Sequence, residues 1–333
     1  MTADVTTIRK ASVSDLPRIQ EIGVAAWRPI YQRCQHILGD ETFFDMFGGW
    51  YLTKCRYKKE WVEDPKRSRV IVTELDGQVV GFATWHPLNP KAGEVSENAV
   101  DPKFQGRGIG TRQVKKVLEF IKQEGAEVAY VLTWLDPTHA PARAQYRAAG
   151  LTRPIPMAWY VNSLQAVAND PVRPDLKVLT GSPEHKDALM QIIEAVWRPI
   201  FDENSRRTEG VYATCYPDAL DKKKEAISKR MTEKPQSLRV VLDGGQPVGF
   251  CLRDFDEATK CGSISSLGVL LWARGRGAAT ALCIEAFRSF RERGLRHARM
   301  IVNHGEDTDS TRAFCNTIGL HRQIPIVGLF GPL

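Results

Sequence analysis

The chain of 333 residues repeats itself, and this constrains its fold more than any other feature. The glycine-rich segment VDPKFQGRGIG at residues 100–110 returns as VLLWARGRGAA at residues 269–279, and the motif WRPI at residues 27–30 recurs at residues 197–200. The displacement stays near 169 residues throughout. A nearly constant displacement of this length indicates a duplicated domain rather than a short-period solenoid. We therefore expect two halves with one fold.

The repeat places a domain boundary near the middle of the chain. We predict an N-terminal domain over residues 1–168 and a C-terminal domain over residues 176–333. Between them, the segment NDPVRPD at residues 169–175 contains two prolines and no hydrophobic periodicity, which is typical of a linker. Each domain is long enough to bury a core of its own.

Composition and charge narrow the class of protein. Hydrophobic residues make up 43% and charged residues 26%, which is typical of a soluble globular protein. The chain has no long apolar run, and residues 1–15 are too polar for a secretory signal, so we expect a cytoplasmic protein with no membrane partner. The net charge of +7 includes a basic run at residues 54–69 that acids interrupt. We therefore expect no nucleic-acid partner, whereas an acidic small ligand fits the modest excess.

The cysteines give no sign of a disulfide framework. Seven are scattered along the chain, an odd number with no CxxC pair. This pattern also argues against a zinc site of the usual spacing. We expect reduced thiols and no bound metal.

Hydrophobic periodicity and turn signals predict the order of elements in the first half. An Asp-Gly turn at residues 76–77 between two alternating segments is a strong hairpin signal. The expected strands are residues 5–10, 69–75, 78–85, 94–100, 128–134 and 155–161, and the expected helices are residues 12–26, 40–63, a segment ending at 125, and 140–149. The second half repeats this order. Mixed strands and helices in this order predict an α/β fold in which a central mixed sheet is flanked by helices.

Both glycine-rich segments stand where a strand turns into a helix. Such a turn presents unpaired backbone N–H groups at the positive end of the helix, which can hold a phosphate without any side chain. The alternative is that the glycines only make a tight strand-to-helix turn.

The motifs around the first segment carry a family resemblance. A strand ending in VxP, with Val100 and Pro102, is followed by QxxGxG, with Gln105, Gly108 and Gly110. A tyrosine, Tyr146, precedes a Gly-Leu pair by four residues. In these motifs and in its element order the chain resembles the GNAT superfamily of acyl-CoA-dependent N-acetyltransferases, and its tandem layout is similar to that of mycothiol synthase.

The resemblance implies where an acyl donor binds. In the family the sheet splays open between its fourth and fifth strands, and the pantetheine arm of the donor lies there as a pseudo-strand. The implied donor-binding residues of the first half are Asn98, Ala99, Val100, Gln105, Gly106, Arg107, Gly108, Ile109, Gly110 and Thr111. Those of the second half are Arg274, Gly275, Arg276, Gly277, Ala278 and Ala279, where the motif becomes RxxGxA and Leu271 replaces the proline.

Acetyl transfer from a thioester to an amine needs two proton transfers. A primary amine is mostly protonated at neutral pH, and the departing thiolate is helped by a proton donor. By resemblance, Tyr146 matches the general acid of the family; the alternative is a core aromatic residue whose hydroxyl bonds to the backbone.

Two carboxylates are candidates for the base. Glu94 lies six residues before Val100, where histone acetyltransferases of the superfamily place a catalytic glutamate. Strict alternation puts Glu94 on one face of the strand and Glu97 on the other, and a bulge, common in the family, could exchange them. Either could instead be a solvent-facing strand residue. His86 could begin a proton relay and His139 could cap the acid-bearing helix, although a structural role suits both.

The second half lacks these groups. The counterparts of Glu94, Glu97 and Tyr146 are Ser263, Ser266 and Cys315. We therefore expect an active first domain and a degenerate second domain that keeps its phosphate loop. The expected function is an N-acetyltransferase, monomer or homodimer, that moves an acetyl group from acetyl-CoA to a primary amine of a small molecule by direct attack. The alternatives are an acyl-CoA-binding protein with a non-catalytic sensor or structural second domain, and an acetyltransferase that acts on a protein.

Overall fold

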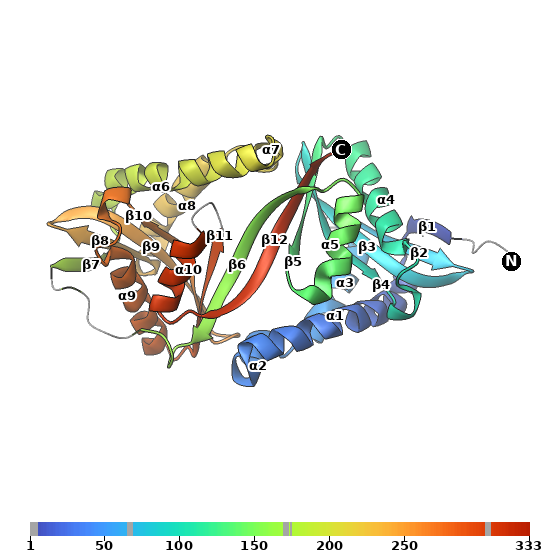
Figure 1. The fold of residues 1–333 in the computed structure, drawn as a ribbon, viewed down its shortest axis with the longest axis horizontal. Coiled ribbons are helices and arrows are strands. Elements are labelled where there is room, and N and C mark those ends of the chain that lie inside the picture. The colour runs from blue at the N-terminus through green and yellow to red at the C-terminus, as the bar shows by residue number, and fades with distance from the viewer. Residues whose placement is uncertain (1–5, 65–68, 169–172, 174, 304–307) are drawn as a thin grey trace.

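The computed structural model describes residues 6–64, 69–168, 173, 175–303 and 308–333. Most of the expected linker, residues 169–175, lies outside this described part. The described strands form one mixed sheet of twelve strands with helices on its faces, which confirms the predicted α/β class (Figure 1). No helix in the described ranges combines the length and apolar character that crossing a bilayer requires.

The elements follow the predicted order in both halves, except that two helices stand where one was expected at residues 40–63 and again at the equivalent place in the second half. Those of the first half are β1 (Thr6–Lys10), α1 (Leu16–Leu38), α2 (Asp40–Phe47), α3 (Trp50–Glu63), β2 (Arg69–Leu75), β3 (Gln78–Asn89), β4 (Ala92–Val100), α4 (Ile109–Gln123), β5 (Val128–Trp134), α5 (Ala140–Ala148) and β6 (Arg153–Ser163). Those of the second half are β7 (Leu176–Thr180), α6 (Lys186–Arg207), α7 (Val211–Cys215), α8 (Ala219–Glu233), β8 (Leu238–Asp243), β9 (Gln246–Asp256), β10 (Cys261–Val269), α9 (Ala278–Glu292), β11 (His297–Asn303), α10 (Thr308–Thr317) and β12 (Arg322–Pro332). Short 3₁₀ turns precede several helices.

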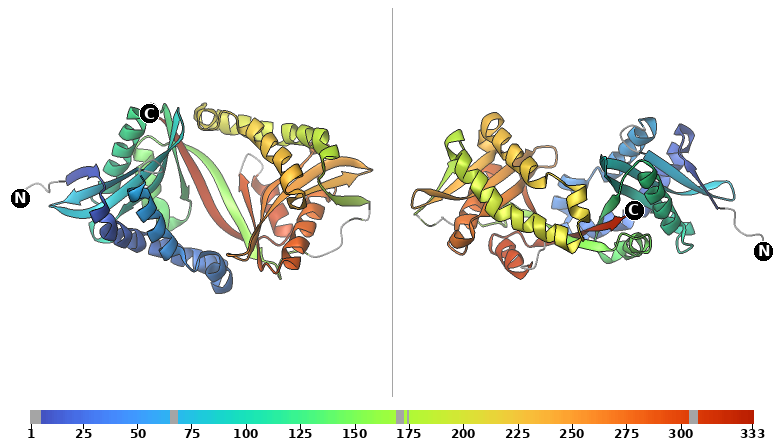
Figure 2. Two further views of the ribbon diagram at one scale, coloured as in Figure 1. Left: turned by 180° about the vertical axis from the view of Figure 1, so that it is seen from behind. Right: turned by 90° about the horizontal axis from the view of Figure 1, so that it is seen from above.

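The two halves exchange their last strands. The strand order is β1-β2-β3-β4-β5-β12-β6-β11-β10-β9-β8-β7, so β12 pairs with β5 of the first half and β6 pairs with β11 of the second. The exchanged strands also pair with each other, with Ile155 opposite Gly328 and Trp159 opposite Ile324. They run side by side between the halves in Figure 1 and in the left view of Figure 2. The sequence repeat gives no sign that each half is completed by a strand of the other.

Helices cover both faces of the first half's sheet. On one face, which we call the α4 face, Val114 and Ile121 of α4 pack with Val95 in one apolar cluster. On the other, the α1 face, Ile19 of α1 packs with Ala99 of the same strand. Burial of these apolar side chains is the main term that holds the helices on the sheet.

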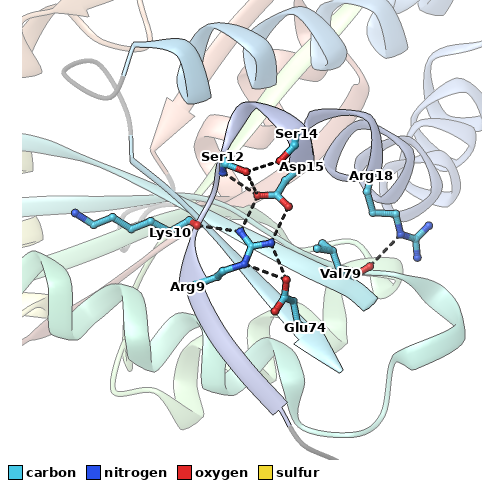
Figure 3. A network of polar contacts seen from close by, with 8 residues as sticks. All are labelled: Arg9, Lys10, Ser12, Ser14, Asp15, Arg18, Glu74 and Val79. Atoms are coloured by element: carbon cyan, nitrogen blue, oxygen red, sulfur yellow. Dashed lines mark hydrogen bonds and ion pairs between the residues drawn. The ribbon is translucent and has the colours of Figure 1, made fainter. Parts of the chain in front are cut away.

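A charged network fixes the start of α1 against the sheet edge. The guanidinium of Arg9 on β1 donates to Asp15 at 2.7 Å and to Glu74 of β2 at 2.6 Å (Figure 3). Asp15 also accepts from the backbone N–H of Ser12 at 2.8 Å. The hydrogen bond from Arg9 holds the pKa of the Asp15 carboxyl well below its usual range. The network therefore joins β1, β2 and the turn that begins α1.

Helices from each half also reach across to the other. Asp45 of α2 lies 2.7 Å from the Nε2 atom of His297, at the start of β11. In the reciprocal contact, the side-chain amide of Asn89 on β3 donates to the carbonyls of Thr214 and Cys215, at 3.0 and 2.9 Å, on α7. The halves are thus tied by strands and by helices.

Candidate active site

The predicted splay lies between β4 and β5. The two strands pair in parallel from Ala92 opposite Val128 to Glu94 opposite Tyr130. Beyond that point β4 continues to Val100 and β5 to Trp134, and the described residues there form no ladder with each other. The backbone edge of β4 after Glu94 is therefore not paired with β5, and another extended chain can pair with such an edge.

The first glycine loop lies at the end of this edge. Gly106 and Gly108 have φ values of +79° and +73°, which side chains other than glycine rarely adopt. Gly108 is the N-cap of α4, so the first N–H groups of the helix point out of the loop. The side-chain amide of Gln105 donates to the carbonyl of Val100 at 3.0 Å and ties the loop to β4.

The remaining candidate residues of the loop lie with these glycines. Gln105, Gly106 and Arg107 are exposed, and Ile109 and Gly110 are buried in the first turn of α4. A Cβ on Gly110 would come 2.4 Å from the Oε1 atom of Gln145 on α5. The third glycine of the motif therefore lets α5 approach α4.

The side-chain amide of Asn98 connects β4 to α4 and α5 beside the splay. Its side-chain nitrogen donates to the carbonyl of Gly110 at 3.3 Å and to Gln145 at 3.0 Å, whereas Ala99 is buried on the α1 face. The structure thus gives Asn98 a side-chain role that the sequence did not suggest.

A β-bulge puts both candidate carboxylates on one face. In the pairing of β4 with β3, Glu97 lies opposite Thr84 and Val95 lies opposite Trp85, so Ser96 is the extra residue. The bulge reverses the alternation, because Val95 packs on the α4 face and Ala99 on the α1 face. Glu94 and Glu97 therefore both lie on the α1 face of the sheet. Strict alternation, which separates them, does not hold in this strand.

Glu94 belongs to a hydrogen-bonded group. The hydroxyl of Tyr130 donates to its Oε2 atom at 2.5 Å, and the Nε2 atom of His86 lies 3.2 Å from the same oxygen. The Nδ1 atom of His86 lies 2.7 Å from the hydroxyl oxygen of Ser96. The side chain of Glu94 is 20% exposed, so an incoming molecule can reach it.

Glu97 is more deeply buried and is paired with a lysine. Its side chain is 4% exposed, and its Oε1 atom lies 2.5 Å from the Nζ atom of Lys54 on α3. Lys54 in turn lies over the ring of Trp27, 4.9 Å from its centroid. The pair places a buried carboxylate in the splayed part of β4.

Tyr146 is buried on the opposite side of the splay. It belongs to the α4-face cluster with Val114 and Leu151. Burial raises the pKa of its hydroxyl, and the negative charge of Glu97 raises that pKa further. Tyr146 therefore holds its proton at neutral pH and lies within electrostatic reach of Glu97.

The second half contributes residues to this site that sequence analysis missed. Tyr216, which follows α7, lies against Tyr130 with ring centroids 5.9 Å apart, and its hydroxyl is near enough to influence the pKa of Tyr130. Burial raises the pKa of Tyr216 to about 12. Burial, and then the charge of Glu94, raise the pKa of Tyr130. The period-two pattern of β5 could have pointed to Tyr130, but only the exchanged fold brings in Tyr216.

The second half has the same architecture with other side chains. Its strands β10 and β11 pair from Cys261 opposite His297 to Ile264 opposite Met300 and then diverge. Gly275 and Gly277 have φ values of +74° and +88°. The Nε atom of Arg274 donates to the carbonyl of Val269 at 3.3 Å, as Gln105 does to Val100. The loop geometry is therefore retained; Arg276, Ala278 and Ala279 complete the turn into α9.

In the second half, the counterparts of the candidate catalytic residues make different contacts. Ser263 accepts a hydrogen bond from Arg299 at 2.6 Å, and Ser266 accepts one from Lys223 at 2.7 Å. Cys315 is fully buried, and burial raises the pKa of its thiol to about 12. Among the described residues, no group of His, Cys, Asp and Glu side chains is arranged to hold a metal ion.

Comparison with known proteins agrees with this architecture. The model of the Acetyltransferase (GNAT) family matches residues 25–151 and 197–318, which together are more than half of the chain. The chain therefore belongs to the GNAT acetyltransferase family and is an acyltransferase with two tandem GNAT domains.

Similar proteins include other tandem forms. Mycothiol acetyltransferase of Nocardia farcinica is 26% identical over 240 residues, which are 70% of this chain and 73% of that protein. The structure of a GCN5-related N-acetyltransferase from Sphaerobacter thermophilus covers 98% of this chain and 95% of its own, with a TM-score of 0.64 and 19% identity. A tandem GNAT protein from the clavulanic acid biosynthesis pathway covers 98% of both chains, with a TM-score of 0.52 and 15% identity. At these identities the two structures show a shared fold.

Proposed function

We propose that the first half transfers an acetyl group from acetyl-CoA to the primary amine of a small molecule by direct attack. One observation carries this proposal: the edge of β4 that β5 leaves unpaired ends at the exposed glycine loop before α4, with Glu94 and Glu97 on one face of the sheet and Tyr146 on the other. A thioester between them has a proton donor on one side and carboxylates on the other.

The donor is held by the main chain. The free edge of β4 at Asn98, Ala99 and Val100 pairs with the pantetheine amides, and the amides from Gly106 to Thr111 bind the diphosphate at the positive end of α4. The exposed glycine loop and the helix N-cap at Gly108 support this assignment. The loop is tied to β4 through Gln105, so both parts of the donor are held in one register.

Glu94 acts as the general base. It is the more accessible of the two carboxylates, at 20% exposed against 4% for Glu97. It takes a proton from the incoming ammonium, directly or through a water molecule, and Tyr130 and His86 hold its oxygen in place. Glu97, paired with Lys54, holds α3 against the splayed part of β4.

Tyr146 acts as the general acid. Its raised pKa keeps the hydroxyl protonated at neutral pH, so it can donate to the departing thiolate, whose own pKa is near 8.5. No covalent intermediate on the protein is required, because the amine attacks the thioester directly.

The acceptor is a small amine. The matched relative is named for a small molecule, mycothiol, and acidic residues interrupt the basic run of the chain at residues 54–69, which does not favour an RNA partner. The test is to measure free thiol released from acetyl-CoA across a panel of amino acids, polyamines and aminoglycosides. Tyr146→Phe should lower turnover by about 10²-fold while leaving the affinity for coenzyme A unchanged. An unchanged turnover would show that Tyr146 is not the acid.

A further inference from the structure

Lys223 is a partly buried lysine of the second half, on the face of the sheet that α6 and α8 cover. It lies on α8, and its Nζ atom is 2.7 Å from the hydroxyl oxygen of Ser266 on β10. The same ammonium position lies 4.5 Å from the centroid of the Trp197 ring, on α6. The side chain is therefore directed toward the sheet and held against an aromatic face.

The first half of the duplicated chain contains an equivalent lysine, Lys54. In the first half, Lys54 lies over Trp27 in the same way, but it faces a carboxylate, Glu97, at 2.5 Å. In the second half a serine hydroxyl replaces that carboxylate. The lysine and the tryptophan are retained, and only the negative charge is lost.

Loss of the carboxylate changes the chemistry of the amine. A buried ammonium without a counter-charge is destabilised relative to the neutral amine. Burial accordingly lowers the pKa of Lys223 to about 8. At pH 7, about a tenth of the Lys223 side chains then carry the free amine, a much larger fraction than for an ordinary lysine. A neutral amine is a nucleophile, and a desolvated lysine is a familiar way to obtain one.

Ser266 also lies at the right place in the sheet. Ile264 is the last residue of β10 that pairs with β11, and a register shift between Ile264 and Ser266 makes the same bulge that carries Glu97 in the first half. Lys223 thus approaches the splayed part of β10, on the strand whose end is tied to the second glycine loop through Arg274.

We propose that the second half binds an acyl-CoA thioester at its own glycine loop and transfers the acyl group to the Nζ atom of Lys223. The neutral amine attacks the thioester carbonyl, the new C–N bond forms, and the C–S bond breaks. The proton lost by the nitrogen goes to the departing thiolate, which leaves as the coenzyme A thiol. The product is an amide on Lys223, and because it is uncharged, burial no longer opposes it.

This step rests on the proposed use of acetyl-CoA as donor but needs no external amine. The experiment is to incubate the full chain with acetyl-CoA alone and to map acetylated lysines by peptide mass spectrometry over time. We expect Lys223 to be acetylated at least ten times faster than two internal controls. These are Lys54, paired with Glu97, and Lys224, paired with Glu194 at 2.5 Å. Equal rates at the three lysines would overturn the proposal.

Two variants of Ser266 separate the chemistry from folding. Ser266→Glu restores the ion pair of the first half and should abolish acetylation of Lys223, whereas Ser266→Ala should preserve it. Thermal unfolding of both variants shows whether they remain folded. Acetylation that persists in folded Ser266→Glu contradicts the role of the missing charge.

Use of the loop is tested with two further probes. Free coenzyme A should compete with acetyl-CoA and slow acetylation of Lys223, and S-acetylpantetheine, which lacks the nucleotide, should react at least ten times more slowly. If both thioesters acetylate Lys223 at the same rate, the loop does not hold the donor, and the proposal is overturned.

A further variant separates failure of the self-acylation from failure of the proposed function. In Tyr146→Phe, thiol release with an external amine should fall while acetylation of Lys223 continues at the same rate. If acetylation of Lys223 falls with it, the first half modifies Lys223 and the second half does not act alone. If thiol release with amines fails in the unmodified chain but Lys223 is acetylated, the self-acylation stands without the proposed function.

Discussion

Tyr216 of the second half lies against Tyr130 of the first half, with ring centroids 5.9 Å apart, and Tyr130 donates a hydrogen bond to Glu94. An aromatic residue of one half therefore packs against the tyrosine that holds the proposed base of the other. The second half thus contributes a side chain to the candidate site of the first.

Removing the Tyr216 hydroxyl should impair the first half. In Tyr216→Phe the ring remains and only the hydroxyl that interacts with Tyr130 is lost, and a loss of about 1 kcal/mol corresponds to a roughly fivefold lower kcat. The KM for acetyl-CoA should not change. Steady-state kinetics with an active amine measures this. Tyr212→Phe on the neighbouring turn of α7 is the matched control, because its hydroxyl interacts with Asn204 and not with Tyr130. Equal effects of the two substitutions would argue against a role for the Tyr216 hydroxyl.

The two carboxylates should respond differently to neutralisation. Glu94→Gln should lower kcat/KM for the amine by about 10²-fold at neutral pH, and the deficit should shrink at high pH, where the free amine needs no base. Glu97→Gln should instead leave Lys54 without its counter-charge and lower the free energy of unfolding by about 2 kcal/mol. Rate–pH profiles and urea denaturation separate the two. If only Glu97→Gln abolishes turnover while remaining fully stable, the assignments must be exchanged.

The glycine loop can be tested with a paired substitution. Gly106 and Gly125 both have positive φ values, +79° and +95°, and a Cβ on either meets no atom within 4 Å. Alanine at either position should therefore cost a similar strain, about 1 kcal/mol. Only Gly106→Ala should raise the KM for acetyl-CoA, by about tenfold. Calorimetric titration with coenzyme A provides an independent measure, and equal affinities in the two variants would remove the loop from the donor site.

His139 should make the fold sensitive to acid. Its ring stacks on Trp134 at 5.6 Å, and burial lowers its pKa to about 4. Between the unfolded value near 6.5 and this folded value, the unfolded chain binds the extra proton, so stability falls as the pH falls. Between pH 7 and pH 4.5, we expect the free energy of unfolding to fall by roughly 2 kcal/mol less in His139→Phe than in the unmodified protein. Urea denaturation at the two pH values checks this, and parallel losses in both proteins would contradict it.

Local chemistry made much of the fold predictable. The Asp-Gly turn at Asp76 produced the expected hairpin, and the expected strands 69–75 and 128–134 coincide with β2 and β5. The expected helix at residues 40–63 is divided at Gly48 and Gly49 into α2 and α3. The expected helix at residues 12–26 extends to Leu38 through Pro29, because the following turn is apolar on its buried side.

The parts of the site that were missed depend on contacts between distant residues. The bulge at Ser96 is set by pairing with β3, so the face of Glu97 could not be read from β4 alone. Both closing strands are apolar, and nothing in either pattern says whether β6 pairs beside β5 or beside β11. The exchange therefore hid the approach of Tyr216 to Tyr130.

A crystal structure with bound coenzyme A would decide whether the main chain just after β4 holds the acyl donor. We expect the diphosphate within about 3 Å of the amides between Gly106 and Thr111, with the pantetheine arm paired along Asn98 to Val100. Coenzyme A bound elsewhere, with β4 and β5 closed against each other and the loop at Gln105 empty, would contradict it.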